Sequence, residues 1–149
     1  MSLPDTSDCA RLPSSARALA HSYGVGSRAK ERAQAKALEL AAQTAGTVRG
    51  DDNRGAAQAA GVVVLCVPYS NHDATLEEIK PAMDGKILVD AVVPLVPPKV
   101  SVVQLPAAGS PAAVAQRVLG PQVRVAAAFH NVGAKKLHGG EKVDCDVLV

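Results

Sequence analysis

Three side chains near residue 30 could bind a phosphate group. Ser27 and Arg28 follow the short segment SYGVG, and Arg32 lies one helical turn further along the chain. An arginine can donate two parallel hydrogen bonds to a phosphate, and a serine hydroxyl can donate to the same group or cap the helix. In nucleotide-binding α/β folds, an acid at the end of the second strand holds the ribose 2′-hydroxyl of NAD. A small polar residue with an arginine accommodates a 2′-phosphate instead. The pattern therefore predicts a phosphate site, with a solvated basic helix start as the alternative.

Aromatic and titratable side chains follow two later apolar segments. Tyr69 comes after GVVVLCVP, where its ring could pack on a ribose or a ring; a half-buried loop aromatic is the alternative. His130 follows QVRVAAAF and could contact a ligand or move a proton, although no nearby Ser, Cys or carboxylate marks a catalytic pair. His72 and Asp73 begin a helix, where Asp73 favours the helix dipole and His72 is expected at the surface. We therefore predict binding residues and no catalytic residue.

The cysteines predict neither a metal site nor a disulfide framework. Cys9, Cys66 and Cys145 lie far apart and lack the spacing of metal ligands, which is typical of free thiols in a reducing compartment. Because Cys66 lies in an apolar strand pattern, we expect an inert thiol in the core. The sequence also contains no Walker A, HExxH, GxSxG or CxxC motif.

The segments that carry these residues alternate between helix and strand patterns. The predicted helices are SRAKERAQAKALELAAQTAG, AAQAA, SNHDATLEEIKPAMDG and SPAAVAQRVLG, and TVRGDDNRG is expected to be loop and turn. The predicted strands are SYGVG, GVVVLCVP, KILVDAVVPL and QVRVAAAF, followed by a loop and a final DVLV. GVVVLCVP is apolar on both faces, as a central strand of a parallel sheet is. The alternation predicts an α/β fold with a Rossmann-like, doubly wound parallel sheet in three layers.

No strand pattern precedes Ser22. Residues 1–21 contain prolines and serines without apolar periodicity, and we expect a poorly ordered leader or a remnant of a first helix. The GxGxxG loop with which a dinucleotide-binding sheet normally begins does not occur. We therefore expect residues 22–149 to form a partial NADP-binding domain that lacks the first strand of its sheet.

The composition excludes several classes of protein. The 149 residues match one domain, and 48% are hydrophobic but only 2% aromatic, which predicts a folded core of small side chains. The net charge of +2 is too small for contacts with many phosphates of a nucleic acid. The longest apolar stretch is much shorter than the about 20 residues that span a bilayer, and no signal-peptide pattern is present. We therefore expect a cytoplasmic protein that binds neither nucleic acid nor membrane.

Several segments together resemble one family. In order, GSRAKERAQAKA, VVVLCVPYSNH, GKILVDAVVPL, AAFHNVGA and DCDVLV are similar to the NADPH-dependent reductases of the deazaflavin coenzyme F420. The most specific part is AFHN with VVPL upstream. The resemblance implies reversible hydride transfer between NADPH and F420 without a covalent protein intermediate, so that the protein binds and stacks two rings. It implies these small-molecule coenzymes as partners and allows a homodimer.

The phosphate-binding positions of the family match the first group of residues. The resemblance implies that Ser27, Arg28 and Arg32 hold the 2′-phosphate, with Arg32 standing where the family often has lysine. The family also opens with an apolar strand and a glycine-rich turn, and it continues past DVLV into a further helical portion. This sequence matches neither part, so we expect an incomplete member of the family.

The ring-binding positions match residues in the later loops. The resemblance implies that Tyr69 lines the cofactor cleft, that Leu95 and Ala134 lie near the nicotinamide, and that His130 lies beside the two rings. Asp73 follows as a weaker position at a helix start.

Two alternatives remain open. A non-catalytic remnant, or an interaction module that needs a second chain to supply the missing strand, would account for the absent glycine-rich loop. Another NADP-dependent reductase, of the pyrroline-carboxylate or hydroxy-acid type, would share the strand pattern. We rank that class last because it should lack AFHN.

Overall fold

The computed structural model of the protein describes residues 22–44, 46–98, 102–133 and 146–149. The chain divides into an N-terminal unit, residues 1–60 and 132–146, and a C-terminal unit, residues 61–131 and 147–149. Each unit is described by itself. The expected leader, together with Ala134, Cys9 and Cys145, lies outside the described residues.

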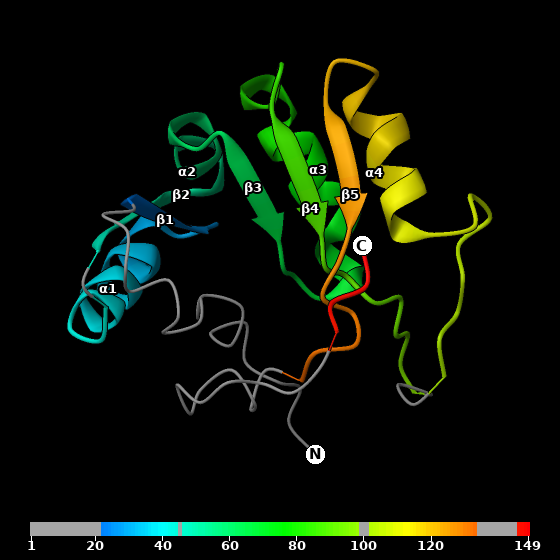
Figure 1. The fold of residues 1–149 in the computed structure, drawn as a ribbon, viewed down its shortest axis with the longest axis horizontal. Coiled ribbons are helices and arrows are strands. Elements are labelled where there is room, and N and C mark those ends of the chain that lie inside the picture. The colour runs from blue at the N-terminus through cyan, green and yellow to red at the C-terminus, as the bar shows by residue number, and fades with distance from the viewer. Residues whose placement is uncertain (1–21, 45, 99–101, 134–145) are drawn as a thin grey trace. The chain divides into compact units, whose positions relative to one another are not determined.

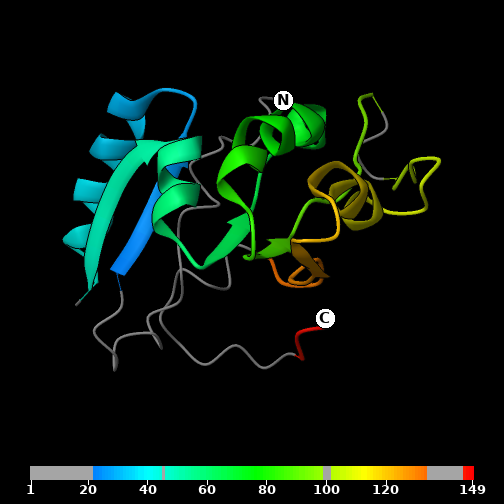
Figure 2. The same ribbon diagram turned by 90° about the horizontal axis from the view of Figure 1, so that it is seen from above.

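The N-terminal unit contains a two-stranded parallel sheet between two helices. Strand β1 (Ser22–Ser27) pairs with β2 (Thr47–Asp52), in a register that runs from Ser22 opposite Thr47 to Ser27 opposite Asp52 (Figure 1). Helix α1 (Lys30–Ala41) connects the two strands, and α2 (Asn53–Ala59) follows β2. The two helices lie on opposite sides of the sheet, which gives this unit three layers (Figure 2).

Small residues allow the helices of this unit to approach the sheet closely. Helix α1 buries Ala33, Ala37 and Leu40, which are three and four residues apart and therefore share one face. A side chain at Gly50 of β2 would collide with the backbone of Ala33, so α1 rests directly on the strand at this point. On the other face, a side chain at Gly24 would point at Ala56 of α2. Together with Leu40, these alanines and glycines thus form the core of the N-terminal unit.

The C-terminal unit is a three-stranded parallel sheet with its strands in chain order. Strand β4 (Ile87–Asp90) lies between β3 (Val62–Leu65) and β5 (Arg124–Ala127). Helices α3 (His72–Ile79) and α4 (Pro111–Leu119) pack against each other and lie on the same side of the sheet in Figure 1. Two 3-10 turns, η3 (Tyr69–Asn71) and η4 (Lys80–Ala82), flank α3.

The core of this unit lies between the sheet and α3. Leu76 of α3, Leu88 of β4 and Met83 beyond η4 are fully buried. Ala115 lets α4 approach closely, since it too is fully buried. Apolar burial of this kind contributes most of the stability of a small domain.

Helix α4 begins with a serine cap that can be tested. The Ser110 hydroxyl accepts a hydrogen bond from the Ala113 amide at 3.1 Å, and Pro111 occupies the first turn. Ser110→Ala should lower the free energy of unfolding by about 1 kcal/mol, because the amide loses its acceptor. Urea denaturation measures this change. Ser110→Asp keeps a cap and should retain the stability; a loss as large as that of the alanine variant would contradict the assignment.

The α/β fold class with parallel strands is confirmed, but some elements differ from the prediction. Residues 47–52, expected to be loop and turn, form β2. Strand β3 is not buried on both faces, since Val62 is 53% and Val64 45% exposed; among the described strands it pairs only with β4. Cys66 follows β3 and is half-buried, so the prediction that it lies inside a buried strand was wrong. Residues 146–149 have no regular secondary structure.

Candidate functional site

The predicted phosphate-binding residues lie at the carboxyl end of β1. Ser27 is the last residue of the strand, and its hydroxyl accepts a hydrogen bond from the Ala29 amide at 3.4 Å. The side chains of Arg28 and Arg32 are exposed, and neither forms an ion pair with another described residue. Ligands of parallel sheets bind beyond the carboxyl ends of the strands. Both arginines therefore lie at the end of the strand where such ligands bind.

The helix start differs from the prediction in one respect. Ser27 does not cap α1, because it is still paired in β1 and the helix begins only at Lys30, with Ala29 at the N-cap and no side-chain cap. Arg28 consequently lies before the helix, and it does not share a helical face with Arg32. Arg28 directly follows β1, and Arg32 lies in the first turn of α1.

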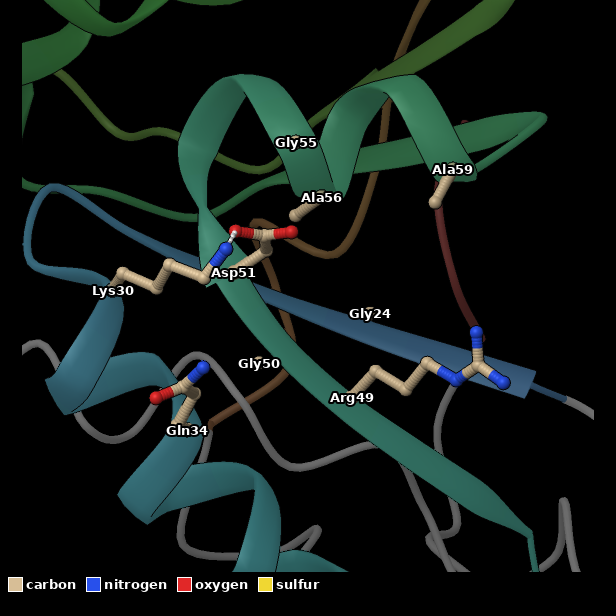
Figure 3. Close-up of a pocket in the computed structure, with 9 residues that line it drawn as sticks. All are labelled: Gly24, Lys30, Gln34, Arg49, Gly50, Asp51, Gly55, Ala56 and Ala59. Atoms are coloured by element: carbon tan, nitrogen blue, oxygen red, sulfur yellow. Dashed lines mark ion pairs between the residues drawn. The ribbon is translucent and has the colours of Figure 1, made fainter.

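The N-terminal unit also contains a pocket of about 450 Å³. Its lining comes from both strands and both helices of the N-terminal unit, namely Gly24, Lys30, Gln34, Arg49, Gly50, Asp51, Gly55, Ala56 and Ala59 (Figure 3). Lys30 and Asp51 point toward one another and form an ion pair at 2.7 Å, which raises the pKa of Lys30 and lowers the pKa of Asp51. The guanidinium of Arg49 extends away from this pair (Figure 3). Neither Arg28 nor Arg32 lines the pocket, so it is separate from the predicted phosphate site.

In the C-terminal unit, the residues after β3 surround a buried histidine. His72, expected at the surface, is fully buried, because α3 turns its first residue toward the end of β4. Its Nε2 lies 2.9 Å from Asp90 Oδ2, and its Nδ1 lies 2.9 Å from Asp73 Oδ1. Asp90 is also fully buried, whereas the side chain of Asp73 is 75% exposed. The ring of Tyr69, in η3, lies 6.1 Å from the His72 ring.

Both ring nitrogens of His72 therefore face a carboxylate. A neutral imidazole has one N–H and would point its lone pair at the second carboxylate, whereas an imidazolium donates to both. Burial lowers the pKa of His72, but the hydrogen bonds with Asp90 and Asp73 outweigh it, so that the pKa is raised. The arrangement favours a protonated histidine beneath the ends of the strands.

Sequence reasoning missed this pair. Asp90 and His72 are 18 residues apart, and no periodicity connects them. The available signal was Asp90 itself, a charged residue at the end of the apolar run ILV. A buried carboxylate needs a partner, and a nearby histidine is an obvious candidate.

The remaining predicted residues lie in separate loops. Leu95 is 39% exposed and forms a bridge with Val103 after β4. His130 is exposed and follows β5 and Phe129, whose φ of 70° is in the left-handed region. Ala134 lies outside the described residues. The structure thus places Tyr69, Leu95 and His130 after successive strands of the C-terminal unit.

Within the described residues, no group of three or more His, Cys, Asp or Glu side chains is arranged to hold a metal ion. No helix in this part of the chain is long and apolar enough to cross a membrane.

Known proteins are similar to much of the chain. Residues 16–94 match the model of a family described as NADP oxidoreductase coenzyme F420-dependent. Proteins named F420-dependent NADP reductase from Methanothermobacter thermautotrophicus and Methanothermobacter marburgensis are each 41% identical to the chain over 134 residues. One from Methanocaldococcus jannaschii is 36% identical over the same length.

These similarities cover most of this chain but only part of each relative. The matches include 84% of this chain and 57%, 59% and 60% of the three reductases, so the chain spans less than two thirds of their length. The crystal structure of a hypothetical protein from Sinorhizobium meliloti has a similar fold, with a TM-score of 0.65 and 22% identity. That similarity covers 88% of this chain and 59% of the other.

Proposed function

Because the chain belongs to the family of coenzyme F420-dependent NADP oxidoreductases, we propose that it binds NADP(H) for hydride exchange with F420. The model of that family matches residues 16–94, which are more than half of the chain. The curated relatives are reductases named for the same two coenzymes. We further propose that residues 22–149 are a partial NADP-binding domain, since the chain matches only part of each relative.

One observation carries the proposal. Arg28 and Arg32 are exposed at the carboxyl end of β1, beside Ser27, and form no ion pair with another described residue. An NADP-binding site needs cations at this position for the 2′-phosphate, and an acid would instead select NAD. The donors present therefore fit the phosphate that distinguishes NADP(H) from NAD(H).

The bound coenzymes supply the hydride chemistry, and the residues of this chain bind and orient them. We assign Ser27, Arg28 and Arg32 to the 2′-phosphate. In the C-terminal unit, Tyr69 and Leu95 follow β3 and β4, and we assign them to the ring end of the nucleotide. Orientation of two reactants in contact contributes much of the rate of such a transfer.

Two other predicted positions are His130 and Asp73. His130 is exposed after β5 and is assigned to the second ring by resemblance alone. Asp73 accepts a hydrogen bond from His72, so its role is to support that ring as much as to contact a coenzyme.

Arg28→Ala tests the phosphate assignment. Loss of one charge-assisted hydrogen bond should weaken NADPH binding by about tenfold to a hundredfold, while NADH, which lacks the 2′-phosphate, should bind as before. Calorimetric or fluorescence titration with both nucleotides measures this. Arg117→Ala removes an exposed arginine of α4 and should leave both affinities unchanged. Equal affinities for NADPH and NADH, unaltered by Arg28→Ala, would refute the assignment.

A second candidate is a nucleotide-binding module without its own catalysis. Among the described strands, β1 pairs only with β2 and β3 only with β4, so each keeps one unpaired edge. Unpaired edges are templates for a further strand. On this view a partner segment completes the fold before hydride transfer can occur. Transfer from NADPH to F420 by the isolated 149 residues would exclude this candidate.

A further inference from the structure

The buried pair of His72 and Asp90 joins two loops at the carboxyl ends of the strands. His72 directly follows η3, which contains Tyr69, and is the first residue of α3. Asp90 is the last residue of β4 and directly precedes the loop that contains Leu95. The 2.9 Å contact between Nε2 and Oδ2 therefore links the loop after β3 to the loop after β4.

Asp90 also fixes the backbone of its own loop. Its second carboxylate oxygen, Oδ1, accepts a hydrogen bond from the Val92 amide at 3.0 Å. Its carbonyl oxygen accepts one from Ala128, after β5, at 3.2 Å, and the next amide, Ala91, donates to Leu65 of β3 at 3.0 Å. All three strands meet at this residue. A shift of the Asp90 side chain would therefore move the start of the loop that leads to Leu95.

The charges around His72 are few and come from two elements. Asp73, on α3, contacts Nδ1, and Asp90, on β4, contacts Nε2. These two carboxylates are the charged groups that act on the ring; Arg117 of α4, the helix packed on α3, is not among them. Loss of the proton would turn one ring nitrogen from a donor into an acceptor facing a carboxylate oxygen.

We propose that His72 and Asp90 are positioning residues for the nucleotide, which hold the loops of Tyr69 and Leu95 in their binding geometry while His72 carries its second proton. This inference rests on the proposed function, because it assumes that these loops contact NADP(H). Neither side chain touches the coenzyme itself, since both are fully buried. The pair makes nucleotide affinity depend on pH through a group outside the binding surface.

Two variants test the proposal by NADPH titration between pH 6 and pH 9. In His72→Gln the amide can still donate to Asp90 but cannot titrate, so the loss of affinity that we expect of the wild type at high pH should be absent. In the double variant His72→Leu/Asp90→Leu, apolar side chains replace both partners, which often preserves stability. It should fold but bind NADPH about tenfold more weakly at pH 6, because the loops of Tyr69 and Leu95 lose the link that holds them.

Controls separate this inference from the proposed function. Glu77→Gln removes an exposed charge from α3 and should follow the wild-type pH profile, and this comparison also cancels the ionisation of NADPH itself. Amide exchange should show faster exchange at Val92 in the double variant. If the wild type binds no NADPH, the proposed function fails and the positioning role fails with it. If the wild type binds but the double variant has the same affinity and pH profile, only the positioning role is refuted.

Discussion

Gly50→Ala is expected to disrupt the packing of the N-terminal unit. A Cβ at this position of β2 would overlap the carbonyl group of Ala33, which belongs to the backbone of α1 and cannot rotate away. The helix would have to move off the sheet and expose Ala33, Ala37 and Leu40. We expect the free energy of unfolding to fall by about 3 kcal/mol, the upper end for an overpacked core.

Gly24→Ala is the matched control for this substitution. Gly24 lies in the neighbouring strand, and a Cβ there would lie 3.7 Å from the Ala56 carbonyl oxygen, an ordinary contact. The same added methyl group should therefore be tolerated. Urea denaturation and amide exchange in α1 measure both variants. Equal stability of the two would show that α1 does not rest on β2 at Gly50.

The same contact explains why β2 could not be predicted. The segment TVRGDD has one strongly apolar residue, Val48, and its glycine and aspartates are typical of turns. Strand β2 is stabilised by the close approach of α1 at Gly50. This contact joins residues that are distant in the chain, so the pattern of the segment itself does not predict it. The helices were predicted better, because alanine and leucine periodicity specifies α1 directly, and Ser110 and Pro111 mark the start of α4.

The candidate site divides in the same way. Arg28 and Arg32 could be placed at a strand end from sequence because they follow β1 immediately, and their position depends only on neighbours in the chain. His72 could not be placed, because its burial depends on where β4 ends. Its partner Asp90 comes from that distant strand, and only the three-dimensional fold brings the two side chains together. The protonation state of His72 follows from that contact.

In the C-terminal unit, Asp90→Ala should lower the stability more than Asp73→Ala does. Removal of one partner from a buried pair leaves the other without compensation, which costs about 3–5 kcal/mol. The Val92 amide loses its acceptor as well. Urea denaturation at pH 6 measures the loss. Asp73→Ala removes the exposed carboxylate from the same ring and should cost at most about 1 kcal/mol, as exposed pairs do.

The stability should also depend on pH, and Asp90→Ala should weaken this dependence. The pKa of His72 is raised in the folded protein from its ordinary value of 6.5. The folded state therefore binds the proton more tightly than the unfolded state, and the resulting stabilisation is complete below about pH 6.5. It is lost as the pH rises through the pKa of the folded protein. The wild type should thus unfold at lower urea concentration at pH 9 than at pH 6, and Asp90→Ala should show a smaller difference. An equal pH dependence in both proteins would mean that the proton on His72 does not stabilise the fold.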